Sequence, residues 1–257
     1  IHLPNCTQFP IAYYAALSLG AVVIPFNPLY VAREMEYQLK DSETEIIITL
    51  SRFYKMIKGI QSKTALKKII IANIKDYFPR FLSFLYTLLK EKKEGDRVEI
   101  EPGDYLFNEL ISKHKGQEPP EVEVNSYDHA LFLYTGGTTG VSKGAILRHS
   151  NLVANMCQVK AWCTDYEEGK EILLGALPFF HSYGLTTILN LGLLNGGKLI
   201  LLPRFILKDV LKTIDKEKPT IFPGVPTMYV AINNAPDLEK YDIKSIRVCI
   251  SGAAPLP

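Results

Sequence analysis

The sequence lacks the features that mark several large classes of protein. Its 257 residues carry a net charge of only +2, so no strong electrostatic attraction to nucleic acid is expected. It has no run of about 18 apolar residues, so no membrane-spanning helix is expected. The four scattered cysteines form no Cys-x-x-Cys pair, which argues against a zinc site and against a disulfide scaffold. Cys6, Cys157, Cys163 and Cys249 suit a reducing interior, and we expect a cytoplasmic protein.

The two ends lack the marks of a natural beginning and end. The opening "IHLPN" has no methionine, basic region or cleavage signal, and "VCISGAAPLP" stops in a loop after an expected strand. Both ends look like cuts through a folded unit, so we expect a fragment of a longer protein. No pattern in the sequence indicates an oligomeric state.

Short apolar runs alternate with helical patterns along most of the chain. Strands are expected at 21–25, 45–49, 68–72, 130–134, 144–148, 198–202, 220–224 and 247–251. Helices are expected between Thr7 and Gly20, at 30–42, at 151–163 with Ser150 as cap, and at 184–195, 207–217 and 226–234. This alternation indicates parallel βαβ units, and continuously apolar strands indicate sheets covered on both faces. The expected fold class is α/β, with mostly parallel sheets flanked by helices.

Residues 74–126 interrupt this alternation. The mostly apolar run 81–89 is followed by a tail rich in lysine and glutamate, and it is too short to span a bilayer. One interpretation is a core helix or an insertion. The other is a surface helix that touches membrane or lipid through Phe81, Phe84, Leu85, Leu88 and Leu89, flanked by Arg80, Lys90, Lys92 and Lys93. Residues 115–128, rich in proline and glutamate, are expected to be a surface linker.

The stretch "TGGTTGVSKG" has the composition of a phosphate-binding loop. Its glycines, Gly136, Gly137, Gly140 and Gly144, permit positive φ, so that successive N–H groups can turn inward and bind an anion. The hydroxyls of Thr135, Thr138, Thr139 and Ser142 can donate to phosphate or bind Mg²⁺, and Lys143 adds a mobile positive charge. We therefore expect all nine residues to contact a nucleotide.

The loop matches neither of two familiar nucleotide-binding patterns. A Walker A loop needs Gly-Lys-Ser/Thr at the start of a helix, whereas here Ser142 precedes Lys143, and Gly144 leads into an apolar strand-like run. The Gly-x-Gly-x-x-Gly fingerprint of dinucleotide-binding proteins is also absent from the loop. The loop is therefore expected to join a strand to a strand.

"YTGGTTGVSKG" resembles the phosphate loop of the adenylate-forming enzymes, which include acyl-CoA ligases, adenylation domains and luciferases. Their pattern is [YF]-T-S-G-T-T-G-x-P-K-G, so Gly136 replaces the usual serine and Ser142 the usual proline. A T-G-G-T-T-G core is similar to that of the long-chain fatty acid–CoA ligases. The opening 30 residues also match the family's early pattern, and the resemblance covers nearly the whole chain.

Three later segments support this resemblance in the expected order. "LPFFHSYGLT" resembles the P-x-x-H-x-x-G segment, which implies that His181 lies beside the reacting carboxylate at the acyl pocket. "GVPTMYVAINN" resembles the segment that lines the acyl tunnel, although an ordinary core helix is an equal alternative. "SGAAPLP" resembles the segment that lies against adenine. The implied residues are Gly224, Val225, Thr227 and Met228 for the acyl chain, and Ser251, Gly252, Ala253, Ala254 and Pro255 for the nucleotide.

The stretch "SYGLTT" imitates another family motif, Y-G-x-T-E, whose glutamate helps to hold Mg²⁺. Thr187 stands at the glutamate position, and the stretch precedes the adenine segment, whereas the motif should follow it. We therefore assign Tyr183 and Gly184 to the His181 segment and expect the true motif beyond Pro257.

The resemblance implies an ATP-dependent acid–CoA ligase, with ATP, Mg²⁺ and CoA as cofactor and co-substrates. A fatty acid is activated as an acyl-adenylate and then transferred to CoA. Lys143 and His181 are the implied catalytic residues, and Thr138 is the implied metal ligand. Residues 1–126 would be part of the first subdomain of a layered αβαβα N-terminal domain, with an insertion near 74–95. Residues 127–257 would bind nucleotide and acyl chain, and the mobile C-terminal domain would be absent.

Several alternatives stay open at this point. The acid can be long-chain, medium-chain or aromatic, because only part of the pocket is visible in the sequence. A natural truncation would leave a non-catalytic module that binds nucleotide or acyl chain, and the fragment alone is expected to be inactive. The partners expected are small molecules, with a peripheral membrane contact through 81–89 as the further alternative and no nucleic acid.

Overall fold

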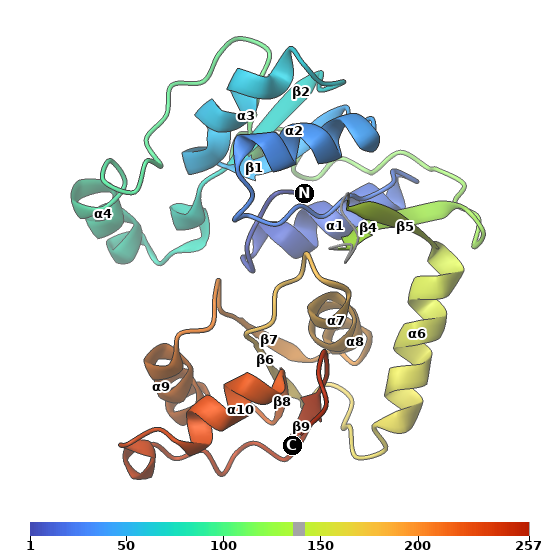
Figure 1. The fold of residues 1–257 in the computed structure, drawn as a ribbon. Coiled ribbons are helices and arrows are strands. Elements are labelled where there is room, and N and C mark those ends of the chain that lie inside the picture. Colours follow the sequence, from blue (N-terminus) through green and yellow to red (C-terminus); the bar gives the residue numbers. More distant parts are fainter. Residues whose placement is uncertain (136–141, 257) are drawn as a thin grey trace. The chain divides into compact units, whose positions relative to one another are not determined.

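The structure is a computed structural model that describes residues 1–135 and 142–256 (Figure 1). The chain divides into two compact units. Unit 1 contains residues 1–3 and 7–146, and unit 2 contains residues 4–6 and the chain from Leu147 onward. The sequence-based division between residues 126 and 127 concerned functional subdomains and stays a prediction.

Unit 1 is built around a small parallel sheet with strand order β1-β2-β3. In this sheet Ile48 lies opposite Ile70, and Ile70 lies opposite Tyr105. The elements of unit 1 in chain order are α1 (Gln8–Ser18), α2 (Ala32–Asp41), β1 (Ile46–Leu50), the 3₁₀ turn η1 (Ser51–Phe53), α3 (Tyr54–Gln61), β2 (Lys68–Ala72), the 3₁₀ turn η2 (Ile74–Tyr77), α4 (Arg80–Leu89), β3 (Tyr105–Leu106), α5 (Phe107–Lys113), β4 (His129–Thr135) and β5 (Lys143–Arg148).

The core of unit 1 shows why these apolar runs form strands. Ile47 of β1 and Ile69 of β2 are fully buried, together with Met35 of α2 and Ile57 of α3. Alternate residues of each strand point to opposite faces, so Ile47 and Ile69 lie on the same, fully buried face. The isoleucine that follows each of them points to the other face and is only partly buried.

Some local predictions for unit 1 were wrong. Residues 21–25 form no strand, because only Val23 makes a parallel bridge, to Leu131 of β4. Pro25 has no N–H to continue a ladder there. Thr7 does precede α1, but its side chain does not cap the helix. Gly20 follows the end of α1 with φ of +68°, as a C-terminal glycine should.

Helix α4 is a surface helix, and the core-helix interpretation of residues 81–89 is wrong. None of its residues is buried. The segment 115–128 contains no helix or strand and is largely exposed, as expected for a surface linker. Within the described residues, no helix combines the length and the apolar character needed to cross a membrane.

Unit 2 contains a four-stranded sheet with strand order β7-β6-β8-β9, in which every neighbouring pair is parallel. Its central strand β6 was not predicted from the sequence. The elements of unit 2 are α6 (His149–Trp162), β6 (Ile172–Gly175), α7 (Ser182–Gly184), the π-helical segment η3 (Leu185–Asn190), α8 (Leu191–Leu194), β7 (Lys198–Leu201), α9 (Leu207–Glu217), β8 (Ile221–Gly224), α10 (Pro226–Asn233), the 3₁₀ turn η4 (Leu238–Lys240) and β9 (Val248–Ser251).

Helices cover both faces of the unit 2 sheet (Figure 1). Leu174 of β6 packs in one cluster with Val210 of α9 and Ile232 of α10. The neighbouring residue Leu173 points to the other face, where it lies against Gly192 of α8. This arrangement, with the parallel sheet of unit 1, confirms the predicted fold class of mostly parallel sheets flanked by helices.

The helix boundaries of unit 2 were predicted with mixed success. Helix α9 spans the predicted residues 207–217, and α10 begins at Pro226, where a proline is tolerated because the first turn needs no N–H. Helix α6 begins at His149, after Arg148, so the prediction of Ser150 as its cap was wrong.

Candidate active site

The candidate phosphate loop joins two paired strands, as predicted. Strand β4 ends at Thr135 and β5 begins at Lys143, and the two strands form one sheet. A Walker A loop would instead lead into a helix. The predicted nucleotide-binding residues Gly136, Gly137, Thr138, Thr139 and Gly140 lie outside the described residues.

The two ends of the loop are tied together at its base. The Ser142 hydroxyl donates a hydrogen bond to the Thr135 carbonyl oxygen at 2.7 Å. The Tyr37 hydroxyl of α2 in turn donates to the Ser142 carbonyl oxygen at 3.0 Å. In this structure Ser142, predicted to contact phosphate, therefore closes the base of the loop.

The strand that follows the loop passes close to an aromatic ring. A Cβ atom on Gly144 would lie 3.1 Å from the ring of Tyr134, so glycine permits this approach. The Tyr134 hydroxyl donates to Asp41 at 2.5 Å, and burial together with this carboxylate raises the pKa of Tyr134 above its ordinary value. The neighbouring Lys143 is exposed and, within the described part of the chain, forms no ion pair. Its ammonium group is therefore available to an anion.

In unit 2, the predicted site residues follow the carboxyl ends of three neighbouring parallel strands. The chain leaves β6 at Gly175 and reaches His181, leaves β8 at Gly224 and enters Val225, and leaves β9 at Ser251. Open parallel sheets bind ligands beside this edge, because all their strands end there. The structure thus brings the His181, Gly224 and Ser251 segments to one edge of one sheet.

Asn5 holds the segment that leads from β6 to His181. Its side-chain amide donates to the carbonyl oxygens of Gly175 at 3.0 Å and Leu177 at 2.7 Å. Its side-chain oxygen accepts from the Phe179 amide at 2.9 Å. Asn5 is only 3% exposed, so these three bonds satisfy polar groups that water does not reach. Asn5 is therefore a positioning residue that sequence reasoning did not find.

His181 itself is exposed and sits directly before α7. Its Nδ1 atom accepts a hydrogen bond from the Tyr183 amide at 3.3 Å, which caps the first turn of that helix. The second ring nitrogen, Nε2, takes no part in this bond. The arrangement suits a side chain that shapes the approach of a ligand.

The hydroxyls of two tyrosines connect the three segments at this edge through hydrogen bonds. The Tyr183 hydroxyl lies 2.6 Å from the Ile250 carbonyl oxygen and 3.2 Å from that of Gly224. The Tyr229 hydroxyl lies 2.7 Å from the Ile250 oxygen and 2.8 Å from that of Phe222. Burial raises the pKa of Tyr183 to about 12, so its hydroxyl stays protonated and can donate at neutral pH.

Glycine is needed where these rings approach the backbone. A Cβ atom on Gly252 would lie 2.8 Å from the Tyr183 ring, and one on Gly224 would lie 2.9 Å from the Tyr229 ring. The Gly252 amide also donates to the Gly224 carbonyl oxygen at 3.3 Å. The predicted adenine segment and the predicted acyl segment are thereby joined directly.

The Ser251 segment contains an unsatisfied hydroxyl. The Oγ atom of Ser251 is buried and has no hydrogen-bond partner among the described residues. Ser251 also lines a cavity of about 620 Å³ between the end of α6 and β9. Ala253 takes the left-handed conformation with φ of +68°, which is strained for a residue other than glycine. Ala254 and Pro255 beyond it are exposed.

The residues predicted to line the acyl tunnel surround the start of α10. Val225 is half-buried directly before the helix, and Thr227 is exposed in its first turn. Met228 packs against the core cluster formed by the sheet and α9. Their contact with an acyl chain stays a prediction.

Thr187 has a structural role in this molecule. Its hydroxyl donates to the Tyr183 carbonyl oxygen one helical turn earlier at 2.7 Å, and the residue is buried. This hydroxyl is used inside the helix, and the interpretation that "SYGLTT" is not the magnesium motif stays a prediction.

The magnesium site stays a prediction as well. Its proposed ligand Thr138 lies outside the described residues. Among those that are described, no three histidine, cysteine, aspartate or glutamate side chains gather in a way that could hold a metal ion.

The opposite edge of the sheet is held by a buried carboxylate. Glu171 accepts from Arg247 Nη2 at 2.5 Å, from the Glu167 amide at 2.8 Å and from the Thr220 hydroxyl. Burial by itself would raise the pKa of Glu171, but these donors outweigh it and hold that pKa below its ordinary value. The amino ends of β6, β8 and β9 are thus tied together, away from the candidate site.

Comparisons with known proteins agree with this geometry. The family model described as "AMP-binding enzyme" matches residues 1–257. The chain is 40% identical, over 259 aligned residues, to a long-chain-fatty-acid–CoA ligase of Bacillus subtilis, covering 100% of this chain and 46% of that protein. It is 33% identical to 4-coumarate–CoA ligase 1 of Arabidopsis thaliana, covering 99% of this chain and 42% of that protein.

A solved structure extends the comparison to the fold. The chain superposes on ATP-bound MatB from Rhodopseudomonas palustris with a TM-score of 0.76 and 26% identity, covering 99% of this chain and 44% of that one. The chain thus spans less than half the length of each of these three proteins. The family model matches every residue, and the strand–loop–strand arrangement of β4 and β5 and the joined segments at the sheet edge agree with it. The chain belongs to the AMP-binding enzyme family.

Proposed function

We propose that the protein to which this chain belongs is an ATP-dependent acid–CoA ligase, and that its acid is a long-chain fatty acid. The observation that carries the proposal is the union of the His181, Gly224 and Ser251 segments at the carboxyl edge of one sheet, held by Tyr183. The 40% identity to a long-chain-fatty-acid–CoA ligase supports the choice of acid.

The reaction has two displacements. A carboxylate oxygen of the acid attacks the α-phosphorus of ATP, and the bond to pyrophosphate breaks. The thiol of CoA then loses its proton to solvent, its sulfur attacks the acyl carbon, and AMP leaves with the electrons of the broken bond. Both steps depend mainly on orientation and on stabilisation of the negative charge that develops. Magnesium, when bound, would neutralise part of the phosphate charge.

The residues of this chain supply orientation and charge. Lys143, exposed and without an ion pair among the described residues, would neutralise the departing pyrophosphate. The unpartnered Ser251 hydroxyl would meet a polar group of the nucleotide. His181 would direct the carboxylate, which needs no general base because it is already ionised near pH 7. Asn5 and Tyr183 would act as positioning residues, because their hydrogen bonds hold these segments.

A substrate panel tests the proposal. Pyrophosphate release by the full-length protein would be followed with fatty acids of increasing chain length and with 4-coumarate. We expect the highest kcat/KM with long-chain acids, formation of acyl-CoA only when CoA is present, and a loss of at least about 100-fold in Lys143→Ala. A preference for 4-coumarate would refute the choice of acid, and absence of pyrophosphate release with every acid would refute the ligase itself.

A further inference from the structure

Helix α4 has an unusual orientation on unit 1. A surface helix normally turns its apolar face to the protein and its polar face to water. In α4 the apolar side chains point outward: Phe81 and Leu89 are each 71% exposed, Leu88 is 64% exposed and Phe84 is 60% exposed. With 3.6 residues per turn, these four side chains and Leu85 share one broad face of the helix.

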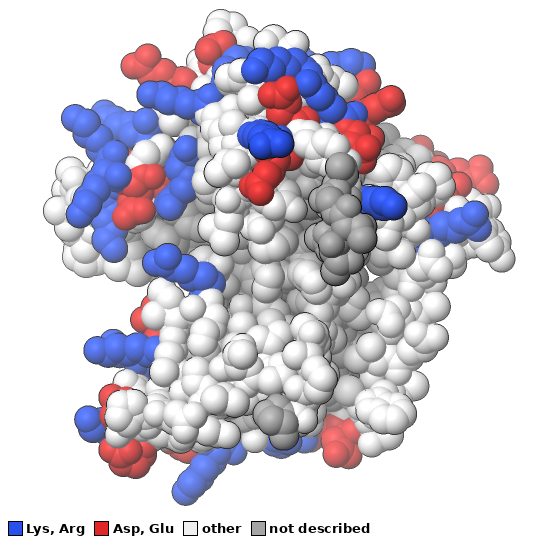
Figure 2. All heavy atoms as spheres, viewed as in Figure 1, with Lys and Arg blue, Asp and Glu red and all other residues white. Residues whose placement is uncertain are grey.

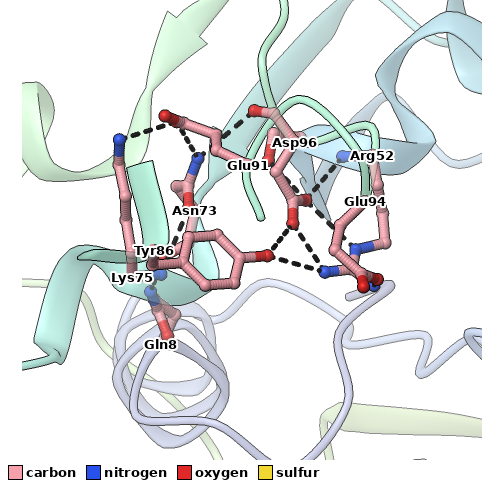
Figure 3. Close-up of polar contacts among 9 residues, drawn as sticks. Gln8, Arg52, Asn73, Lys75, Tyr86, Glu91, Glu94 and Asp96 are labelled. Atoms are coloured by element: carbon pink, nitrogen blue, oxygen red, sulfur yellow. Dashed lines mark hydrogen bonds and ion pairs between the residues drawn. The ribbon is translucent and has the colours of Figure 1, made fainter. Parts of the chain in front are cut away.

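The polar side chains of α4 attach it to the protein. The Tyr86 hydroxyl donates to the Asp96 carboxylate and accepts from Arg52 Nη2 at 3.2 Å (Figure 3). Lys75 Nζ donates to the Thr87 hydroxyl at 2.8 Å. The helix is therefore held by hydrogen bonds from one side, and this contact leaves its apolar side uncovered.

A buried carboxylate fixes the segment that follows α4. Asp96 is 1% exposed and accepts hydrogen bonds from the Ser51 hydroxyl at 2.9 Å and from Arg52 Nε at 3.1 Å. Arg52 also forms an ion pair with Asp96 at 2.5 Å. A charged pair with satisfied donors is costly to break, because one partner would be left uncompensated. The apolar face of α4 is thus presented on a firmly attached element.

A second polar contact anchors the same segment. Buried Glu91 accepts from Lys75 Nζ at 2.6 Å, and the Asn73 side-chain amide donates to the Asp96 carbonyl oxygen at 3.3 Å. Asn73 is connected in turn to α1, because the Gln8 side chain donates to its carbonyl oxygen at 2.8 Å (Figure 3). The outward orientation of α4 is therefore supported by the contacts of Asp96 and by those of Glu91 and Asn73.

Uncompensated positive charges surround this apolar face. Within the described part of the chain, none of the exposed residues Arg80, Lys90, Lys92, Lys93 and Arg97 forms an ion pair. Figure 2 shows mostly lysine and arginine side chains, with a smaller acidic group among them, beside the white surface at the place where Figure 1 draws α4. An apolar helix face bordered by unpaired lysine and arginine side chains is complementary to a layer with an apolar interior and an anionic boundary.

We propose that α4 is an interfacial anchor that lies in the headgroup region of an anionic lipid bilayer. Its ten residues extend about 15 Å, so the helix cannot cross the hydrocarbon core. Phe81, Phe84 and Leu88 enter the acyl boundary, while Lys90, Lys92 and Lys93 meet the lipid phosphates. A second copy of the chain is a poor occupant, because it would bring an equally positive border against this one.

Vesicle flotation of the full-length protein tests the anchor in the absence of ATP, CoA and acid, so the result is independent of ligase activity. Vesicles of phosphatidylglycerol and phosphatidylcholine are compared with vesicles of phosphatidylcholine alone. We expect the Phe81→Ser/Phe84→Ser variant to bind anionic vesicles at least about tenfold more weakly. Each of Lys92→Gln and Lys93→Gln should weaken binding about fivefold, and high salt should reduce the effect of these lysines.

Leu29→Ser is the matched control, since Leu29 is 85% exposed in the same unit but far from α4 in sequence. It should bind like the wild type, and thermal melting should show that all variants stay folded. Vesicle binding that is equal in the wild type and the Phe81→Ser/Phe84→Ser variant would overturn the proposal. Self-association in lipid-free buffer that the same variant abolishes, without any change in vesicle binding, would overturn it in favour of a protein partner.

Discussion

The two tyrosines at the sheet edge allow a quantitative test of how the site is held. Tyr183 and Tyr229 possess two hydroxyl hydrogens, but three carbonyl oxygens lie within reach, those of Phe222, Gly224 and Ile250. Each hydroxyl can donate to one acceptor at a time. The Tyr183 hydroxyl lies closer to Ile250 than to Gly224, whereas the Tyr229 hydroxyl lies at nearly equal distances from Ile250 and Phe222 and can donate to either.

Removing either hydroxyl should therefore have a limited effect. In Tyr183→Phe, the hydroxyl of Tyr229 can turn to Ile250, so the expected loss in the free energy of unfolding is about 1 kcal/mol. Tyr229→Phe should cost a similar amount, because Tyr183 keeps its bond to Ile250. Phenylalanine retains the ring contacts with Gly252 and Gly224, so no cavity forms.

Removing both hydroxyls should cost more than the two single losses together. Ile250 then loses both side-chain donors, and no neighbour can compensate. A double-mutant cycle should give a coupling energy of about 0.5–1 kcal/mol, with a total loss of about 3 kcal/mol.

The assay is denaturant unfolding of the wild type, both single variants and the double variant, with KM for ATP as a second measurement. We expect KM to rise most in the double variant, because the Gly224 and Ser251 segments separate. Losses that add to within about 0.3 kcal/mol would show that the hydroxyls act independently and would refute this reasoning.

Three further predictions follow from neighbouring features. Asn5→Ala should lower the free energy of unfolding by about 2–4 kcal/mol, because two carbonyl oxygens and one amide lose their buried partner. Gln8→Ala removes the bond to the Asn73 carbonyl oxygen and a side-chain bond to Asp76, and it should cost less in the same unfolding assay. Glu171→Gln should be less stable than the wild type at pH 7, because the folded pKa of Glu171 lies below its unfolded value of about 4.3. This difference in stability should shrink as the pH falls through the folded pKa. A difference that does not change with pH would contradict the lowered pKa of Glu171. Purified residues 1–257 alone should make little palmitoyl-CoA, and substantial synthesis by them would contradict the expectation that catalysis needs further chain.

Local pattern predicted much of the fold. The apolar runs at 45–49 and 68–72 became β1 and β2, and α9 occupies its predicted residues, because its apolar positions repeat with the helical period. The run at 21–25 was misleading, since Pro25 interrupts the ladder that Val23 begins. Strand β6 was missed because "ILLG" is short, ends in Gly175 and lies only three residues before Pro178.

The residues of the candidate site could be predicted from the sequence only where they lie in a recognisable motif. His181, Gly224 and Ser251 were found because each lies in a recognisable segment, and the parallel sheet explains why the three meet. Asn5 could not be found in this way, because its partners lie at least 170 residues away in sequence. The bonds of Tyr229 could not be found either, because they exist only after β8 and β9 have paired. The outward face of α4 also depends on Asp96, whose role no local pattern indicates.

The position of Asn5 has a consequence for the order in which the protein folds. Its three hydrogen-bond partners lie 170, 172 and 174 residues further along the chain, so more than two-thirds of these 257 residues must be synthesised before they can all meet. Closing so long a loop is entropically slow, and contacts of this separation generally form late. Residues 4–6 belong to unit 2, although the chain on either side of them belongs to unit 1. The segment before His181 is therefore expected to become ordered in one of the last steps of folding, after both units have largely formed.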